Sequence, residues 1–404
     1  MPVASILDLL LTSLILDSRS GDKDPPRRQI VVFKEGYKPS AATVAELGGK
    51  VLKEIPLVNG IACTITEPIS PRLLSRHREI LRIDEDLPVS IVAEHNFPLP
   101  LFLLLLLFLR PAPGRSKNEG EAVPWGVKMV GAPDIWPLTR GEGVRVAVID
   151  TGVDLDHPGL AANLRPGINI LAGGSPPQDG NGHGTHVAGI IGAVGKGGEL
   201  AGVSPGVEIY PVKALNDKGN GWLSDIIAGV EWCIKNEMHI INMSFVVHGD
   251  NDSLREMLQA ADGAGLLVVA AAGNSGPGEN TVRFPARYGE TIAVSAVDRR
   301  QQIAGFSSRG PEVDLTAPGV EVLSLWPGGK KKIMQGTSMA APHVTGVAAL
   351  VLSVYPTATS TAVKKILLEA ARPLPDLKKS EQGAGLVDAR AVLKVPAVLP
   401  PAGK

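Results

Sequence analysis

GTSMAAPH, residues 336–343, places a serine between a glycine turn and a run of small and apolar residues, 344–353. That run is typical of a buried helix, and the unpaired N–H groups at the start of a helix carry partial positive charge. Ser338 is therefore expected where an oxyanion can be stabilised. Alone, a Gly-Thr-Ser triplet is more often an ordinary turn or helix cap, so its meaning depends on the rest of the chain.

Two stretches upstream supply an acid and a histidine. VAVIDTG at 146–152 is a short apolar run that ends in Asp150, which is typical of a buried parallel strand delivering a carboxylate to the carboxyl edge of a sheet. NGHGTHVAG at 181–189 is a glycine-flanked histidine that leads into a helix of small residues. Singly, Asp150 also fits a turn cap and His183 a core or metal-binding histidine. Together with a serine they are the nucleophile, base and orienting carboxylate that acyl transfer needs.

The motifs DTGVD, HGTHVAG and GTSMAAPH resemble those of the subtilisin-like (subtilase) serine endopeptidases, in that family's order of Asp, His and Ser. The resemblance extends from PWGV at 124–127 to GAGLVD at 383–388. It implies that Asp150 orients, that His183 is the base and that Ser338 is the nucleophile. His186, on the helix beyond the base, is interpreted as structural.

The resemblance also implies an oxyanion donor and two edges for an extended peptide. Asn274, in the turn AAGN at 271–274, would donate to the developing oxyanion without adding a charge beside the base. The segments 218–221 and 244–246 match the two edges, where backbone pairing tolerates many sequences. The expected substrate-binding residues are Gly219, Asn220, Gly221, Ser244, Val246 and Arg283.

The specificity pocket departs from the family pattern. Where many relatives have glycines, this chain has Val246 and Val247, whose methyl groups should narrow the pocket. Arg283 is expected near the pocket floor, where it would attract a carboxylate; a solvated surface arginine is the alternative. We therefore predict a preference for small or acidic side chains before the cleaved bond.

No metal site and no required cofactor are predicted. The tight calcium site of many subtilases uses an acid after the His-Pro of the first motif and an Asn-rich loop, whereas this chain has Gly159 and Lys196 there. Calcium prefers several oxygens with net negative charge, so that site looks degraded. Weaker calcium sites at Asp179, Glu312 or Asp314 stay open.

Composition agrees with a mostly parallel, doubly wound α/β sheet plus a small α+β unit. The chain has 404 residues, 44% hydrophobic and only 4% aromatic, with 46 glycines, which favours tight packing of Ala, Val, Leu and Ile. A net charge of -1 gives no case for nucleic acid as a partner. Two cysteines in different units, Cys63 and Cys233, exclude a disulfide framework.

Upstream of the catalytic motifs the chain changes character. The first segment, 1–27, contains an apolar run at 6–16 that is compatible with a leader, but Asp8 interrupts this run and no basic residue precedes Asp8. Residues 28–95 resemble the inhibitory propeptide of subtilases, with strands expected at 29–33 and 59–65 and helices at 41–47 and 71–81; a generic small domain is the alternative. The expected division is 1–27 leader, 28–95 propeptide, 96–121 Leu-rich segment and linker, 122–395 catalytic domain and 396–404 tail.

The sequence therefore predicts a self-inhibited precursor of a secreted serine endopeptidase. Its partners would be protein or peptide substrates and its own propeptide. The Leu-rich run 97–109 is too short to span a bilayer as a helix, and membrane contact, packing on the propeptide and a sequence artefact stay open. Membrane-associated and intracellular locations are the alternatives. A catalytically silent binding protein is the alternative function. An esterase-like hydrolase is a third possibility, but this chain lacks the Gly-x-Ser-x-Gly elbow, the strand-to-helix turn that carries the nucleophile of that class.

Overall fold

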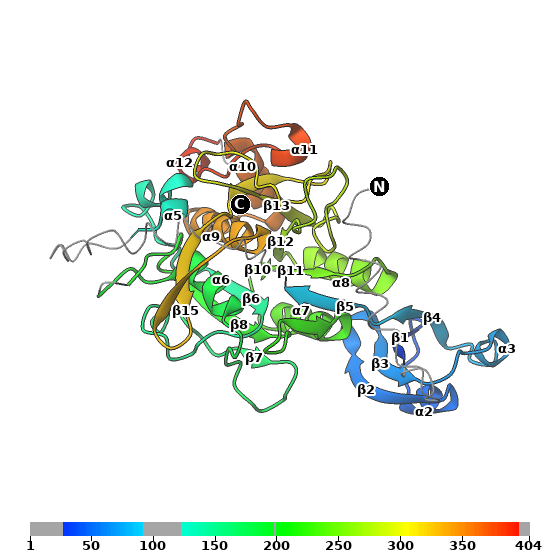
Figure 1. Ribbon diagram of the computed structural model, residues 1–404. Helices are drawn as coiled ribbons and strands as arrows, with labels where there is room; N and C mark the ends of the chain where they lie inside the picture. The colour runs from blue at the N-terminus through cyan, green and yellow to red at the C-terminus, as the bar shows by residue number, and fades with distance from the viewer. Residues whose placement is uncertain (1–26, 92–122, 198, 396–404) are drawn as a thin grey trace, which may run out of the picture.

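The computed structural model describes residues 27–91, 123–197 and 199–395 (Figure 1). They form an N-terminal unit, residues 27–91, and a larger C-terminal unit, residues 123–395. The leader 1–27, apart from its last residue, the Leu-rich segment and linker 96–121 and the tail 396–404 lie outside the described residues.

The C-terminal unit is built on a seven-stranded parallel sheet in the order β14-β13-β12-β10-β6-β8-β7. Its strands are β6 (Arg145–Asp150), β7 (Ile168–Asn169), β8 (Glu208–Lys213), β10 (Ile240–Met243), β12 (Leu267–Ala271), β13 (Thr291–Val297) and β14 (Leu315–Pro318). The central strands β10, β12 and β13 are buried along their whole length because helices cover both faces of the sheet. This confirms the expected fold class.

Alternate residues of β6 face two separate cores. Val146 and Val148 pack with α6 (His183–Gly192), α9 (Thr337–Val354) and α10 (Ser360–Ala370), whereas Ala147 and Ile149 pack with α7 (Leu223–Lys235) and α8 (Asp252–Gly263). The shorter helices are α5 (Trp125–Met129), η2 (Ala132–Asp134), α11 (Lys379–Gln382) and α12 (Ala389–Val392). The strands β15 (Val322–Trp326) and β16 (Lys330–Met334) form an antiparallel hairpin. The sequence also predicts a helix at 223–236 and a strand at 266–272, and α7 and β12 agree with these predictions to within a residue.

One long helix of the described residues has the length and hydropathy of a membrane span. This is α9, but 89% of its apolar window is buried inside the fold, so it is the central helix of the protein core.

The N-terminal unit is a four-stranded antiparallel sheet in the order β2-β3-β1-β4, packed on α2 (Ala41–Glu46). Its strands are β1 (Arg27–Phe33), β2 (Gly49–Ile55), β3 (Gly60–Ile65) and β4 (Ile80–Glu85), with a 3-10 turn η1 (Pro56–Val58). The helix expected over 71–81 is wrong: α3 covers only Pro71–Leu74. Ile80 is buried and Leu81 is exposed, which is the alternation of a strand, and Ile80 pairs with Phe33 of β1.

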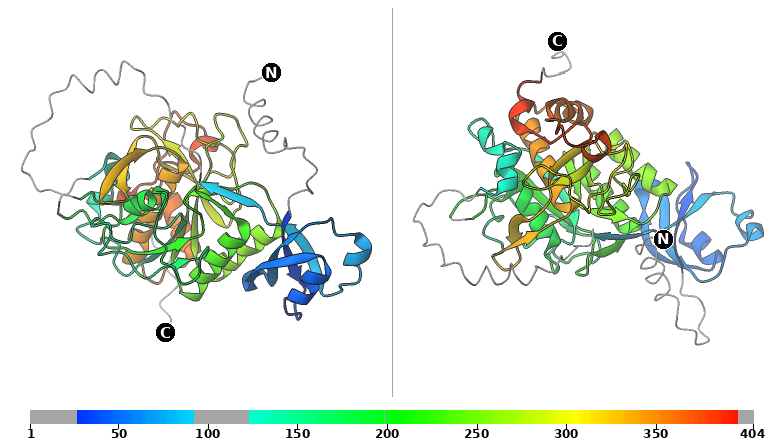
Figure 2. Two further views of the ribbon diagram at one scale, coloured as in Figure 1. Left: turned by 60° about the horizontal axis from the view of Figure 1, so that its bottom comes forward. Right: turned by 45° about the horizontal axis from the view of Figure 1, so that its top comes forward.

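A third sheet joins the two units. β5 (Pro88–Ile91), which follows the N-terminal sheet, lies antiparallel between β9 (Asn220–Trp222) and β11 (Phe245–Val247) of the C-terminal unit. Figure 2 shows this strand reaching from the N-terminal unit into the body of the larger one.

Candidate active site

Asp150 and His183 form a buried pair at the carboxyl edge of the main sheet. Asp150 ends β6 and His183 begins α6, and the two are 0% and 2% exposed. The Nδ1 atom of His183 lies 2.8 and 3.0 Å from the two carboxylate oxygens of Asp150. A carboxylate only accepts, so Nδ1 donates, and the lone pair of the neutral ring is at Nε2, where a general base needs it.

Asp179 holds the start of α6 against the loop after β6. Its carboxylate accepts hydrogen bonds from the Thr151 hydroxyl (2.9 Å), the Gly182 N–H (2.8 Å) and the N–H and hydroxyl of Thr185 (2.9 and 2.6 Å). Because Thr151 follows Asp150 and Gly182 precedes His183, these bonds hold the backbone at Asp150 and the backbone at His183 in a fixed relative position. Sequence reasoning considered this residue only as a weak calcium ligand, and an aspartate four residues before the base was the one available signal.

Ser338 is the second residue of α9 and is 1% exposed. Its hydroxyl donates to the Ser244 carbonyl oxygen at 2.9 Å, and the Ser244 hydroxyl donates to the Ser338 carbonyl oxygen at 3.0 Å. This reciprocal pair ties the start of α9 to the chain between β10 and β11. Gly336, just before the helix, has φ of 148°, a value that L side chains rarely adopt.

The amide of Asn274 is oriented by the residue before the serine. Its Oδ1 accepts from both the N–H and the hydroxyl of Thr337, each at 3.0 Å. The Nδ2 group lies beside Gly336, since a Cβ added to this glycine would be 3.1 Å from it. The structure thus directs an uncharged donor toward the turn that carries Ser338, as an oxyanion site requires.

Two further histidines near these elements are neutral. Burial lowers the pKa of His186 to about 3 and that of His343 to about 4. His186 donates from Nε2 to the Lys332 carbonyl oxygen at 3.0 Å, while Nδ1 of His343 lies 2.8 Å from the Met339 carbonyl oxygen. Both side chains are anchored in the fold, which agrees with the structural interpretation of His186.

The expected substrate-binding segments are the two strands that flank β5. Ser90 pairs with Asn220 on one side and Val246 on the other, and Val89 pairs with Gly221. The Ile91 N–H donates to the Gly219 carbonyl oxygen at 2.8 Å, and a Cβ at Gly219 would lie 2.6 Å from the Ile91 side chain. Val89 is 1% exposed and belongs to the core cluster on the α7 and α8 face. An extended peptide is thus already accommodated between these edges.

Arg283 is exposed, and its side chain lies against the turn that carries Asn274. Its Nε donates to the Ser275 hydroxyl at 2.9 Å, and its Cγ packs beside Gly273. The valines expected to narrow the pocket, Val246 and Val247, are 8% and 2% exposed. The Val247 N–H donates to the Phe284 carbonyl oxygen at 2.8 Å. Because Phe284 follows Arg283 in the sequence, this bond places Val247 close to the backbone of the arginine. The preference for small side chains, from the two valines, and the preference for acidic side chains, from Arg283, both stay predictions.

The expectation that this chain lacks the tight calcium site stays a prediction. Across the described ranges, no group of three or more His, Cys, Asp or Glu side chains is arranged to hold a metal ion. The carboxylate of Asp314 lies 3.4 Å from Lys364, and that of Glu312 lies 3.2 Å from Arg287. Each of these acids therefore already has a cationic neighbour.

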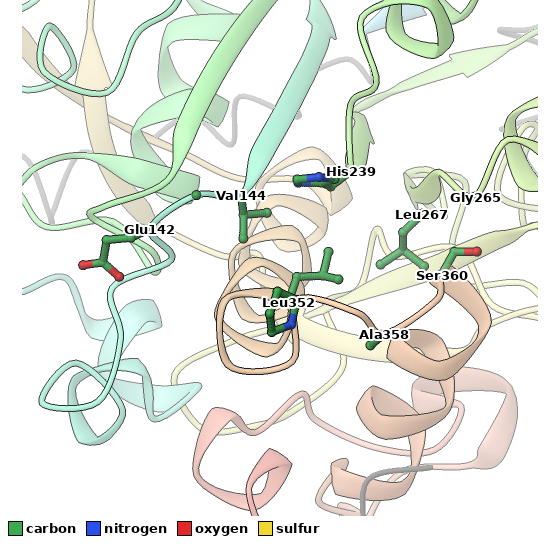
Figure 3. Close-up of a pocket in the computed structure, with 10 residues that line it drawn as sticks. Glu142, Val144, His239, Gly265, Leu267, Leu352, Ala358 and Ser360 are labelled. Atoms are coloured by element: carbon green, nitrogen blue, oxygen red, sulfur yellow. The ribbon is translucent and has the colours of Figure 1, made fainter. Parts of the chain in front are cut away.

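A hollow of about 170 Å³ lies at the opposite edge of the sheet (Figure 3). Val144 just before β6, His239 just before β10 and Leu267 at the start of β12 line it, so it opens at the amino ends of the strands. Open α/β sheets bind ligands at the carboxyl ends, where Asp150 lies. This hollow is not assigned to the site.

Comparison with known proteins agrees with this geometry. A profile described as the subtilase family matches residues 141–386. Subtilisin amylosacchariticus from Bacillus subtilis subsp. amylosacchariticus is 36% identical over 381 residues, covering 92% of each chain. Subtilisin DY from Bacillus licheniformis is 40% identical, over 67% of this chain and 98% of its own. Subtilisin Savinase from Lederbergia lenta is 42% identical, over 68% of this chain and 100% of its own.

The protein is a serine-type endopeptidase on an α/β fold. The chain belongs to the subtilase family, since the matched profile covers more than half of its length and relatives above 30% identity match over most of it. The longer match covers 92% of this chain and so must extend into the N-terminal unit, whereas the family profile, at 141–386, does not reach it.

Proposed function

We propose that the chain hydrolyses peptide bonds through Asp150, His183 and Ser338 and is made as a precursor inhibited by its own N-terminal unit. His183 takes the proton of Ser338 as the hydroxyl attacks a peptide carbonyl, and later gives it to the leaving amine. Asn274 and the Ser338 N–H hold the oxyanion, and water then releases the acyl-enzyme. The buried Asp150–His183 pair, at 2.8 Å, is the observation that carries this chemistry.

Inhibition is supported by strand β5, which takes the position of an extended substrate between β9 and β11. Inhibition by occupying this position needs no further conformational change. A protein substrate would have to displace β5 before it paired with the same edges.

Two acids that precede β5 bind helix starts of the C-terminal unit. Asp86 accepts from the N–H and hydroxyl of Ser224 in α7, at 2.8 and 2.9 Å. Asp84 accepts from the N–H and hydroxyl of Ser253 in α8, at 3.0 and 2.6 Å. Negative charge at a helix N-terminus is favourable, so both contacts stabilise docking of the N-terminal unit. Arg82 adds two hydrogen bonds to Glu256, both at 2.8 Å.

The register of β5 indicates which bond would be cut. Ile91 pairs with Phe245, and the preceding residue on that edge is Ser244, whose carbonyl oxygen accepts from Ser338. We therefore propose that the chain is cut one residue beyond Ile91 in sequence, between Val92 and Ala93, which both lie outside the described ranges. We include this junction in the proposal, with residues 28–95 acting as the propeptide and 122–395 as the catalytic domain.

The test is Ser338→Ala, with Ser75→Ala, an exposed serine of the N-terminal unit, as the matched control. We expect the Ser338 variant to keep the 42.3 kDa of the full chain and to resist a fluorophosphonate label. Wild type and control should be cut, with a new N-terminus at Ala93, and should be labelled. Normal processing of purified Ser338→Ala would refute self-cleavage. An unlabelled processed wild type would indicate the silent binding protein instead.

The secreted location is also part of the proposal. It is supported by relatives that match across the N-terminal unit. Fractionation of the producing culture tests it: activity confined to the cells would contradict it.

A further inference from the structure

Strand β5 defines which side of the site receives the leaving half of a substrate. It enters from the N-terminal unit, and its C-terminal end points toward the hairpin β15–β16 in every view (Figures 1 and 2). The segment before the cleaved bond pairs with β9 and β11. The segment after it must pass His183, because the base gives its proton to the leaving amine.

On that side, Trp326 at the end of β15 lies against the residue that precedes the base. A Cβ added to Gly182 would fall 2.3 Å from the Trp326 ring, so the glycine allows the indole to approach the backbone beside His183. Above the ring sits the Lys332 ammonium, 4.0 Å from its centroid. Trp326 and Lys332 are both partly exposed, so each has surface that a peptide passing beside Gly182 can reach.

The hairpin is fixed to the helix that carries the base. His186 in α6 donates to the Lys332 carbonyl oxygen at 3.0 Å, and the Ser324 hydroxyl donates to the His186 carbonyl oxygen at 2.8 Å. The ammonium of Lys332 therefore projects from a backbone whose distance to His183 is set by α6. A charge held in this way is a better recognition element than one on a loose loop.

The hairpin also concentrates positive charge. Lys330, Lys331 and Lys332 follow one another along β16, and Glu199 approaches one of them, Lys331, at 3.6 Å. The positive field of this strand favours carboxylates over ammonium groups on a passing peptide.

We propose that Trp326 and Lys332 form the subsite for the residues just after the cleaved bond and that this subsite selects acidic side chains there. The inference rests on the proposed peptidase mechanism. It adds a preference for acidic residues after the cleaved bond, which a hairpin of glycine or apolar residues would not give. Lys332 acts here as a specificity-determining residue and takes no part in bond breaking.

The test compares three quenched fluorescent peptides that share the sequence VSIV before the cleaved bond and carry Ala-Glu, Ala-Ala or Ala-Lys after it. With processed wild type we expect kcat/KM for Ala-Glu to exceed that for Ala-Ala by roughly fivefold, the scale of one partly exposed ion pair. Lys332→Gln should bring this ratio to about one, and Lys332→Glu should favour Ala-Lys. Lys378→Gln removes the same charge from an exposed site and should leave the ratio unchanged.

The outcomes separate this inference from the proposed function. Equal ratios in wild type and Lys332→Gln, with all peptides cut, would overturn the subsite and leave the peptidase mechanism standing. If processed wild type cuts none of the peptides while Ser338 is labelled, the substrate direction drawn from β5 fails as well. A ratio that changes equally in Lys378→Gln would assign the effect to overall charge and also overturn the proposal.

Discussion

Replacing Asp86 by alanine should loosen the proposed propeptide from the enzyme. The carboxylate is buried, pairs with Arg28 at 2.9 Å and accepts the Ser224 N–H and hydroxyl. Burial raises its pKa, against the lowering effect of these donors, so part of their benefit offsets desolvation. Removing the carboxylate leaves the first turn of α7 without this acceptor and Arg28 without its charge partner.

The loss of binding free energy in Asp86→Ala depends on the contacts that the former partners of Asp86 retain. Hydrogen bonds to charged groups contribute about 1.5–3 kcal/mol, and a buried partner left alone adds to the loss. Arg28 keeps other contacts, since its guanidinium lies 4.4 Å from the Trp222 ring centroid and 3.3 Å from the Ser224 hydroxyl. We therefore take a value near the low end, about 2 kcal/mol, which is roughly a 30-fold increase in the inhibition constant.

The assay titrates processed enzyme with the separate segment 28–95, shown to be folded by circular dichroism. Wild-type segment should inhibit at or below micromolar concentrations, and Asp86→Ala roughly 30-fold more weakly. Glu54→Ala removes the same charge from an exposed position of the segment and should match wild type. An inhibition constant for Asp86→Ala within threefold of wild type would refute the role assigned to this carboxylate. A folded wild-type segment that fails to inhibit would refute the propeptide assignment itself.

Three further predictions address specificity, metal and pH. Before the cleaved bond, Ala and Glu should be preferred to Phe and Tyr, and Arg283→Ala should lower the Glu-to-Ala ratio of kcat/KM; a preference for Phe would contradict the size argument, and an unchanged ratio the charge argument alone. EDTA should leave the melting temperature almost unchanged, because Gly159 and Lys196 replace expected calcium ligands; a large, calcium-reversible drop would show that other oxygens bind it. The unfolding free energy should fall as pH falls from about 6.5 toward 3, because the unfolded chain binds protons that buried His186 and His343 do not; melting curves that coincide at pH 7 and 4 would rule this out.

The main sheet was predictable because its strands are buried on both faces. Runs such as 266–272 are continuously apolar, and only a central strand or a buried helix needs that composition. The helix expected at 71–81 failed although its apolar residues, Leu73, Leu74, Ile80 and Leu81, have helical spacing, because pairing with β1 makes a strand from Ile80 onward. Strand β2 was missed, since the alternation in GKVLKEI is broken by the exposed Leu52 and by Lys53, which stands between Val51 and Ile55 on the other face.

At the site, sequence reasoning found the residues whose motifs are distinctive and missed those that act through position. Asp84 and Asp86 look like ordinary solvated acids in the run IDED, and only the placement of α7 and α8 reveals their partners. Asp179 and Trp326 were missed for the same reason, because each contacts an element distant in sequence. Four residues of β5 carry no signal that they complete a sheet in the other unit.

The strand shared by the two units also makes inhibition by the N-terminal unit depend on protein concentration once the chain is cut. While β5 is covalently linked to the enzyme, it rebinds at an effective concentration that is on the order of millimolar for a short flexible linker and that dilution does not alter. Once the bond after it is cut, the same pairing becomes a reaction between two molecules and obeys mass action. Under the proposed maturation, release of the N-terminal unit would then depend on protein concentration, with inhibition kept where the processed protein is concentrated and lost where it is dilute.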